Sequence, residues 1–376
     1  MRYSIILLFL LLTFSSTKAQ TEDPKTILYL IPFYTEEIKT FDVNSITSDE
    51  DINNITSFKL AGFWEGTEMA FREFEKEGIK LNVIVRDITD DKEKLNQILQ
   101  DTSFMKSIDL IIGPFFAEMF TIAAQYAKTY NIPIVNPFSN RTDFVENNEY
   151  VYKLIPSISA RPILLDSLLL NRYPKTNIIL WGNIDNKSNE LSIYEDYFIK
   201  KQLPYTKVPF KEGITLLMQK MKTNYHNIII TYAETQASII HNVRLLANTG
   251  MLPSYSLVIP EEWLKANEAE TENFNKLNIH YFSNYYVDYQ NDNTLLFVSD
   301  FIERFNCPPD LSRFSFQGYD ITRYFVSRIM TPSDSIQSKF NPISFDFQFN
   351  KIENGGYENQ KARLLQIENF QETEIK

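Results

Sequence analysis

Few side chains in this chain have the types and spacing that catalysis or metal binding needs. The three histidines, His226, His241 and His280, lie in separate segments, and none is near the only cysteine, Cys307. No His-x3-His or Cys-x2-Cys pair occurs, so a zinc site has no support. The sequence also lacks a glycine-rich phosphate loop and a Gly-x-Ser-x-Gly nucleophile motif. We therefore expect a protein with no enzyme activity, no metal and no cofactor.

The aromatic and polar residues that could hold a ligand follow two short apolar runs, 109–112 and 132–135. Between the runs, apolar residues recur at spacings of three and four, which is typical of one helix face. A strand, a helix and a strand within about 30 residues predict a βαβ unit with parallel strands. Ligands in such sheets bind beyond the carboxyl ends of the strands. The residues expected there are Phe115, Phe116, Ser139 and Asn140.

Phe115 and Phe116 have two interpretations. They could form an aromatic platform that faces a ligand, or they could pack beneath the helix that follows. Phe116 starts the apolar stripe of that helix, which favours packing for this residue.

The first residues are typical of a secretory signal peptide. Arg2 precedes an apolar run too short to span a membrane, and Ala19 provides a small residue before the cut. We expect residues 1–19 to be removed and the protein to be exported. No cysteine follows the cut, so a lipid anchor is not expected.

The bulk charge excludes some partners. The chain has 37 Lys and Arg against 48 Asp and Glu, a net charge of −11, which argues against binding to nucleic acid or anionic lipid. Its 376 residues exceed the size at which a single core usually divides, so two domains are expected.

Apolar runs alternate with helical patterns along most of the chain, which predicts an α/β fold with doubly wound parallel sheets. The clearest helix is 58–77, and the polar, mostly acidic stretch 33–57 is interpreted as a solvated loop. Near the C-terminus, 343–349 and 362–367 surround Gly355-Gly356, and we interpret them as the two strands of an antiparallel hairpin.

The order of these segments resembles the type 1 periplasmic-binding-protein fold, the family of leucine/isoleucine/valine-binding proteins. The resemblance rests on FWEGTEMAFREF at 63–74, IIGPFF at 111–116, QGYD at 317–320 and NPISFDF at 341–347, and it covers most of the chain. Residues 354–365 (NGGYENQKARLL) look like the sub-group that is fused to peptidoglycan-binding LysM modules.

The resemblance implies two lobes joined by three crossing segments, with a ligand cleft between them. Lobe one would comprise 21–151 and 290–335, lobe two 158–280, and a C-terminal β segment, 336–376, would pack near the hinge. The crossings would lie near 152–156, near 280–286 and after Thr331.

The resemblance also places lobe-two candidates at the cleft. These are Trp181, Asn183, Tyr232 and Glu261, each at or after a strand end, although Trp181 could equally belong to the core. Family members that bind amino acids have small hydroxyl residues where this chain has Phe115 and Phe116. A phenyl ring cannot accept a hydrogen bond from an ammonium group or donate one to a carboxylate, so the pocket is altered, apolar or absent.

The function expected is therefore an exported, periplasmic binding protein that holds a small ligand or a partner in its cleft without chemistry. The partner could be an envelope protein, a membrane transporter or a component associated with the cell wall. The alternative is a degenerate binding fold that serves as a structural or regulatory interaction module of the cell envelope.

Overall fold

The computed structural model describes residues 23–46, 55–184, 190–232, 235–250, 252–266, 271–309, 314–330 and 340–376. The expected signal peptide lies outside the described residues, as do 47–54 of the acidic stretch and the chain directly after Met330. In the described chain no helix is both long and apolar enough to cross a membrane.

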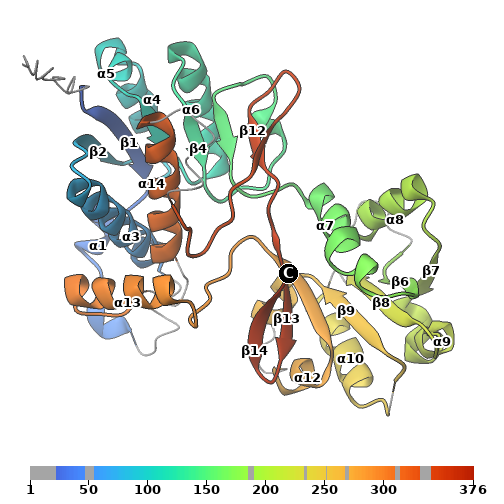
Figure 1. Cartoon of the computed structure of the whole chain (residues 1–376). Helices are drawn as coiled ribbons and strands as arrows, with labels where there is room; N and C mark the ends of the chain where they lie inside the picture. The colour runs from blue at the N-terminus through green and yellow to red at the C-terminus, as the bar shows by residue number, and fades with distance from the viewer. Residues whose placement is uncertain are drawn as a thin grey trace, which may run out of the picture.

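Two seven-stranded sheets, each with helices packed on it, form two α/β lobes (Figure 1). The first sheet has the order β11-β12-β5-β4-β3-β1-β2, and the second has the order β14-β13-β10-β9-β8-β6-β7. The strands of the first sheet are β1 (Lys25–Ile31), β2 (Leu81–Asp87), β3 (Leu110–Ile112), β4 (Ile134–Asn136), β5 (Val151–Lys153), β11 (Phe349–Lys351) and β12 (Tyr357–Asn359). Those of the second are β6 (Thr176–Gly182), β7 (Tyr205–Pro209), β8 (His226–Tyr232), β9 (Tyr255–Ile259), β10 (Ile279–Ser283), β13 (Arg363–Glu368) and β14 (Gln371–Ile375).

In the first sheet β1 to β5 are parallel, and in the second sheet β6 to β10 are parallel, which confirms the doubly wound arrangement. The predicted βαβ unit is present, because β3 and β4 pair in parallel, with Ile111 opposite Ile134, and α6 connects them. Antiparallel pairs occur only toward the C-terminal strands of the described sheets: β11 with β12, β10 with β13, and β13 with β14.

The helices of lobe one are α1 (Thr35–Ile38), α3 (Thr56–Lys76), α4 (Lys92–Leu99), α5 (Thr102–Lys106), α6 (Ala117–Tyr130), α13 (Asp292–Phe305) and α14 (Phe314–Met330). Asp91 caps α4: its side chain accepts hydrogen bonds from the backbone N–H groups of Glu93 and Lys94. The helices of lobe two are α7 (Arg161–Leu168), α8 (Glu190–Lys201), α9 (Gly213–Lys220), α10 (Gln236–Ala247), α11 (Glu261–Ala266) and α12 (Thr271–Lys276).

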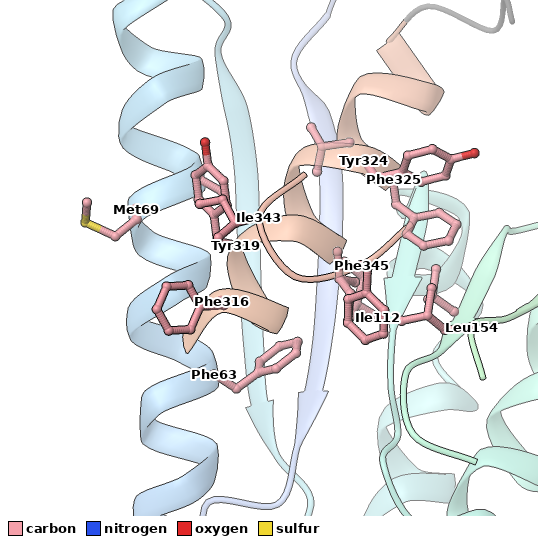
Figure 2. Packing of buried hydrophobic residues seen from close by; sticks show 14 of the residues in the cluster. Phe63, Met69, Ile112, Leu154, Phe316, Tyr319, Tyr324, Phe325, Ile343 and Phe345 are labelled. Carbon is pink, nitrogen blue, oxygen red and sulfur yellow. The ribbon is translucent and has the colours of Figure 1, made fainter. Parts of the chain in front are cut away.

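The core of lobe one lies on both faces of its sheet, because alternate residues of a strand point to opposite faces. Ile27, Tyr29 and Ile31 belong to one apolar cluster, and Leu28 and Leu30 belong to the other. Figure 2 shows part of the first cluster, in which aromatic residues of α3 and α14 meet the strands and the segment near Phe345.

Three segments of the described chain cross between the lobes. The first leaves β5 at Lys153 and reaches α7, and the second leaves β10 and reaches α13. The third is the short stretch between β12 and β13, residues 360–362. The C-terminal segment is therefore divided, with β11 and β12 in the first sheet and β13 and β14 in the second.

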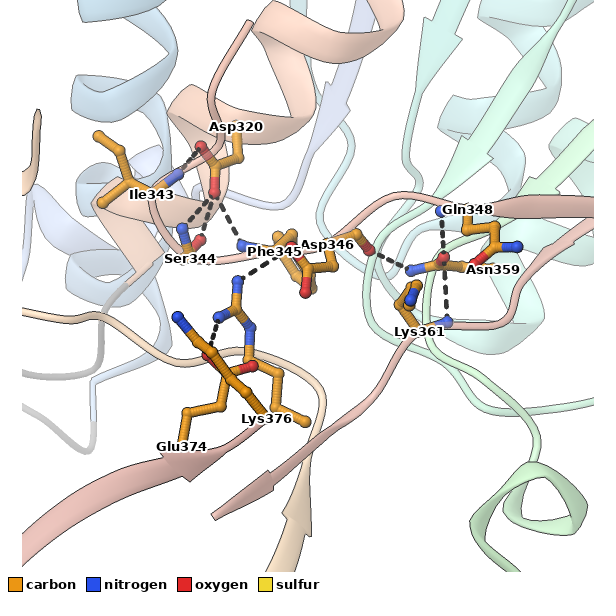
Figure 3. A network of polar contacts seen from close by, with 11 residues as sticks. Asp320, Ile343, Ser344, Phe345, Asp346, Gln348, Asn359, Lys361, Glu374 and Lys376 are labelled. Carbon is orange, nitrogen blue, oxygen red and sulfur yellow. Dashed lines mark hydrogen bonds and ion pairs between the residues drawn. The ribbon is translucent and has the colours of Figure 1, made fainter. Parts of the chain in front are cut away.

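The predicted pairing of 343–349 with 362–367 is wrong, although C-terminal hairpins do exist. Residues 340–348 form no strand, and the antiparallel partner of β13 in the hairpin is β14. The reason is Asp320 on α14, which is fully buried and accepts hydrogen bonds from three successive backbone N–H groups, those of Ile343, Ser344 and Phe345 (Figure 3). Backbone groups bonded to a carboxylate are not available to a strand ladder.

Candidate functional site

A cavity of about 390 Å³ lies between the lobes. Lobe one contributes the loops after β3 and β4, and lobe two contributes the starts of α7 and α11. Its lining residues are Phe115, Phe116, Ala117, Phe138, Ser139, Asn140, Ile155, Pro156, Ile158, Arg161, Glu261, Glu262 and Asn284. Because parallel strands end at one edge of a sheet, loops far apart in sequence meet there.

The aromatic wall of the cavity comes from lobe one. Phe115 is buried and packs edge-to-face on Phe63 of α3 and on Phe138, with ring centroids 4.9 and 5.0 Å apart. Phe116, in contrast, is 38% exposed. The turn before Phe115 needs a glycine at Gly113. Its φ is +90°, and a Cβ added there would stand 2.5 Å from the carbonyl oxygen of Leu30. Of the two phenyl rings, Phe116 is thus the one available to a ligand.

Ser139 and Asn140 are the polar residues of the same wall. The backbone N–H of Ser139 donates to Oδ1 of the fully buried Asn136 at 2.7 Å, and its Oγ accepts from the N–H of Arg141 at 3.2 Å. The Ser139 hydroxyl proton can still donate, since this bond uses only its oxygen as an acceptor. Asn140 is exposed.

The lobe-two wall carries the charges. The guanidinium of Arg161 forms an ion pair with Glu190, and both side chains are mostly buried. Burial alone would lower the pKa of Arg161, but Glu190, Tyr194 and Glu262 together raise it, so the guanidinium is a fixed cation. Glu261 accepts a hydrogen bond from the Ser283 hydroxyl at 3.3 Å.

The other sequence-predicted site residues do not line this cavity. Trp181 is 2% exposed and packs edge-to-face on Phe210, so it belongs to the core of lobe two. Tyr232 is half-buried and packs against the other apolar cluster of that lobe. Asn183 is exposed just after β6.

Sequence reasoning did not select Phe138, Arg161 and Asn284 as site residues. Phe138 lies in a loop that was already singled out, so its position was visible. Arg161 lies where the first crossing enters lobe two, and Asn284 lies where the second crossing leaves it. A charged or amide side chain at a lobe crossing was the sequence signal that could have identified them. Within the described residues, no group of three or more His, Cys, Asp or Glu is placed to hold a metal ion.

Solved structures resemble this chain over nearly its whole length. A putative branched-chain amino acid ABC transporter protein from Rhodospirillum rubrum is 12% identical with a TM-score of 0.67. The match covers 94% of this chain and 100% of that chain. An ABC-type branched-chain amino acid transporter protein from Rhodopseudomonas palustris is 15% identical with a TM-score of 0.58, covering 93% of this chain and 96% of that chain.

An ABC transporter substrate-binding protein from Desulfitobacterium hafniense, solved in complex with leucine, is 16% identical with a TM-score of 0.56. The match covers 94% of this chain and 100% of that chain. This chain has the type 1 periplasmic-binding-protein fold. Neither a protein-family model nor a curated protein sequence matches it.

Proposed function

We propose that this protein is an exported binding protein that holds a small ligand between its lobes and performs no chemistry on it. The observation that carries the proposal is the interlobe cavity of about 390 Å³, which is lined from both lobes and from two crossing segments. A volume in this range suits a small molecule. The three compared structures support the proposal, since they are branched-chain amino acid ABC transporter proteins or an ABC transporter substrate-binding protein in complex with leucine.

The walls of the cavity restrict the ligand. Phe116 presents an exposed ring to an apolar body, and Ser139 and Asn140 can bond a polar group. The carboxylates of Glu261 and Glu262 face the cavity from lobe two, whereas the charge of Arg161 is already compensated by Glu190. We propose that the ligand has an apolar body and a polar group, and that it is not anchored by a carboxylate on Arg161.

A thermal-shift screen tests this proposal. Purified mature protein would be heated with amino acids, short peptides and cell-wall fragments, because a ligand at 100 times its Kd adds about 2.7 kcal/mol to the free energy of unfolding. We expect at least one compound to raise the Tm, and Phe116→Ala to reduce that shift. Hydrolysis of the bound compound would contradict a role without chemistry.

A second candidate is a degenerate fold that binds an envelope protein. It is favoured by the buried position of Phe115 and by the neutralised Arg161, which leave the cleft with little to hold a zwitterion. No Tm shift with any small compound, together with a single partner recovered by crosslinking in cells, would support this candidate over the first.

Export is part of the proposal. The N-terminal sequence of the protein recovered from the periplasm should begin near Gln20 if the signal peptide is cut after Ala19. Recovery of the full-length chain from the cytoplasm would contradict it.

A further inference from the structure

The third crossing has an ion pair that joins the lobes. Arg363, the first residue of β13, forms ion pairs with two carboxylates, those of Asp346 and Glu374; Figure 3 labels both of these acidic residues. One guanidinium nitrogen is 3.2 Å from Oδ1 of Asp346, which precedes β11 on the lobe-one side, and the other is 3.0 Å from Oε2 of Glu374 in β14. Each of the other ion pairs recorded among the described residues joins two groups of the same lobe.

Both ends of this bridge are held in place. Asp346 directly follows the segment that Asp320 holds through Ile343, Ser344 and Phe345, and its carbonyl oxygen accepts from Nδ2 of Asn359 at 2.9 Å. Glu374 is held in the ladder of the hairpin opposite Leu365. Because neither carboxylate lies on a free loop, a change in the angle between the lobes must change the Asp346–Arg363 distance.

The burial of the three groups differs. The side chains of Arg363 and Glu374 are 12% and 15% exposed, whereas Asp346 is 45% exposed. Nε of Arg363 is buried without a hydrogen-bond partner.

We propose that the ion pair between Arg363 and Asp346 is a latch, a contact that holds the two lobes in the relative orientation seen in this structure. The bond of Arg363 to Glu374 keeps the guanidinium on lobe two, and its bond to Asp346 fixes lobe one against it. Breaking the Asp346 bond would release the lobes, while the half-exposed carboxylate becomes solvated at little cost. The latch concerns the ligand-free hinge and does not depend on what the cleft binds.

Two matched variants test the latch. Asp346→Asn removes the cross-lobe bond, and Glu374→Gln removes a carboxylate from the same guanidinium within lobe two. Spin labels would be placed on the native Cys307, which is exposed in lobe one, and on Lys201→Cys at the exposed end of α8. Pulsed dipolar spectroscopy then measures the interlobe distance in the absence of ligand.

We expect Asp346→Asn to decrease several-fold the share of molecules at the wild-type distance, and Glu374→Gln to leave that distance in place. An unchanged distribution in Asp346→Asn would overturn the latch. So would an equal shift in both variants, because that result would indicate charge balance rather than a tie between lobes. Circular dichroism melting confirms that each variant is folded. Since no ligand is present, a failed ligand screen would not affect this result.

Discussion

Gly318 of α14 lies so close to α3 that a Cβ on it would stand 1.9 Å from the carbonyl oxygen of Phe63. A second contact of the same kind joins the two helices, because a Cβ on Gly66 would stand 1.7 Å from the carbonyl oxygen of Ser315. The helices therefore meet backbone to backbone. This contact sets the position of Phe63, whose ring supports Phe115 at the cavity.

Replacing Gly318 with alanine should destabilise lobe one. The added methyl cannot fit unless the helices separate, and overpacking of this kind costs typically about 1–3 kcal/mol and occasionally more. Urea denaturation measures the loss. Gly250 is the control, because nothing lies within 4 Å of its Cβ position, and Gly250→Ala should leave the stability close to that of the wild type. Equal effects of the two substitutions would contradict the close contact.

Phe115 and Phe116 should separate stability from binding. Phe115→Ala removes a ring that is 7% exposed and should cost about 3–5 kcal/mol of folding free energy. Phe116→Ala removes a ring that is 38% exposed, so it should change the Tm little while weakening any ligand found in the screen. Denaturation and calorimetric titration of both variants check this. A strongly destabilised Phe116→Ala would show that this ring serves the core.

Lobe two should lose stability in mild acid. His226 and His280 are buried, and burial lowers the pKa of each to about 4. The unfolded imidazoles take up protons below their ordinary pKa of about 6.5, whereas the folded ones stay neutral. Stability is therefore complete above that pH and is lost as the pH falls from about 6.5 to 4, by about 2 kcal/mol for each histidine at pH 5.

Urea midpoints at pH 7.5 and pH 5 measure the loss. His280→Gln should flatten the dependence on pH even if it lowers stability overall. His241 is exposed, so His241→Gln should retain the wild-type slope. A slope unaffected by His280→Gln would assign the acid sensitivity to other groups.

The first crossing depends on a buried ion pair. Lys153 is fully buried and donates to Oε1 of Glu358 at 2.7 Å and to Oγ of Ser157 at 2.9 Å. The same Glu358 oxygen accepts from the backbone N–H of Ser157, so the pair ties β5, β12 and the crossing together. Burial lowers the pKa of Lys153 although Glu358 opposes the shift. Glu358→Gln leaves this ammonium without its counter-charge and should cost about 3–5 kcal/mol.

The double variant Lys153→Met with Glu358→Leu should recover most of that loss, since no buried charge remains. Denaturation of Lys153→Met, Glu358→Leu and the double variant forms the cycle. The exposed pair Lys351–Glu149 is the control, and Glu149→Gln should cost under about 1 kcal/mol. Additive losses in the double variant would contradict the coupling.

Sequence alone determined the parts of this protein that depend on local order. Apolar runs and helical spacing predicted the βαβ unit of β3, α6 and β4 and the parallel sheets, because burial of a strand or helix face is recorded in nearby residues. The same pattern identified the loop residues Phe115, Phe116, Ser139 and Asn140, since a loop at a strand end follows from the strand.

Only the tertiary structure decided which distant segments meet. Residues 343–349 have the alternation of a strand, yet Asp320 takes their N–H groups and the chain runs irregularly there. Trp181 lies one residue before the end of β6 but packs on Phe210 in the core. Arg161 reaches the cavity because the first crossing places the start of α7 there. Periodicity records whether a side chain is buried, but not the partner that buries it, because that partner comes from elsewhere in the chain.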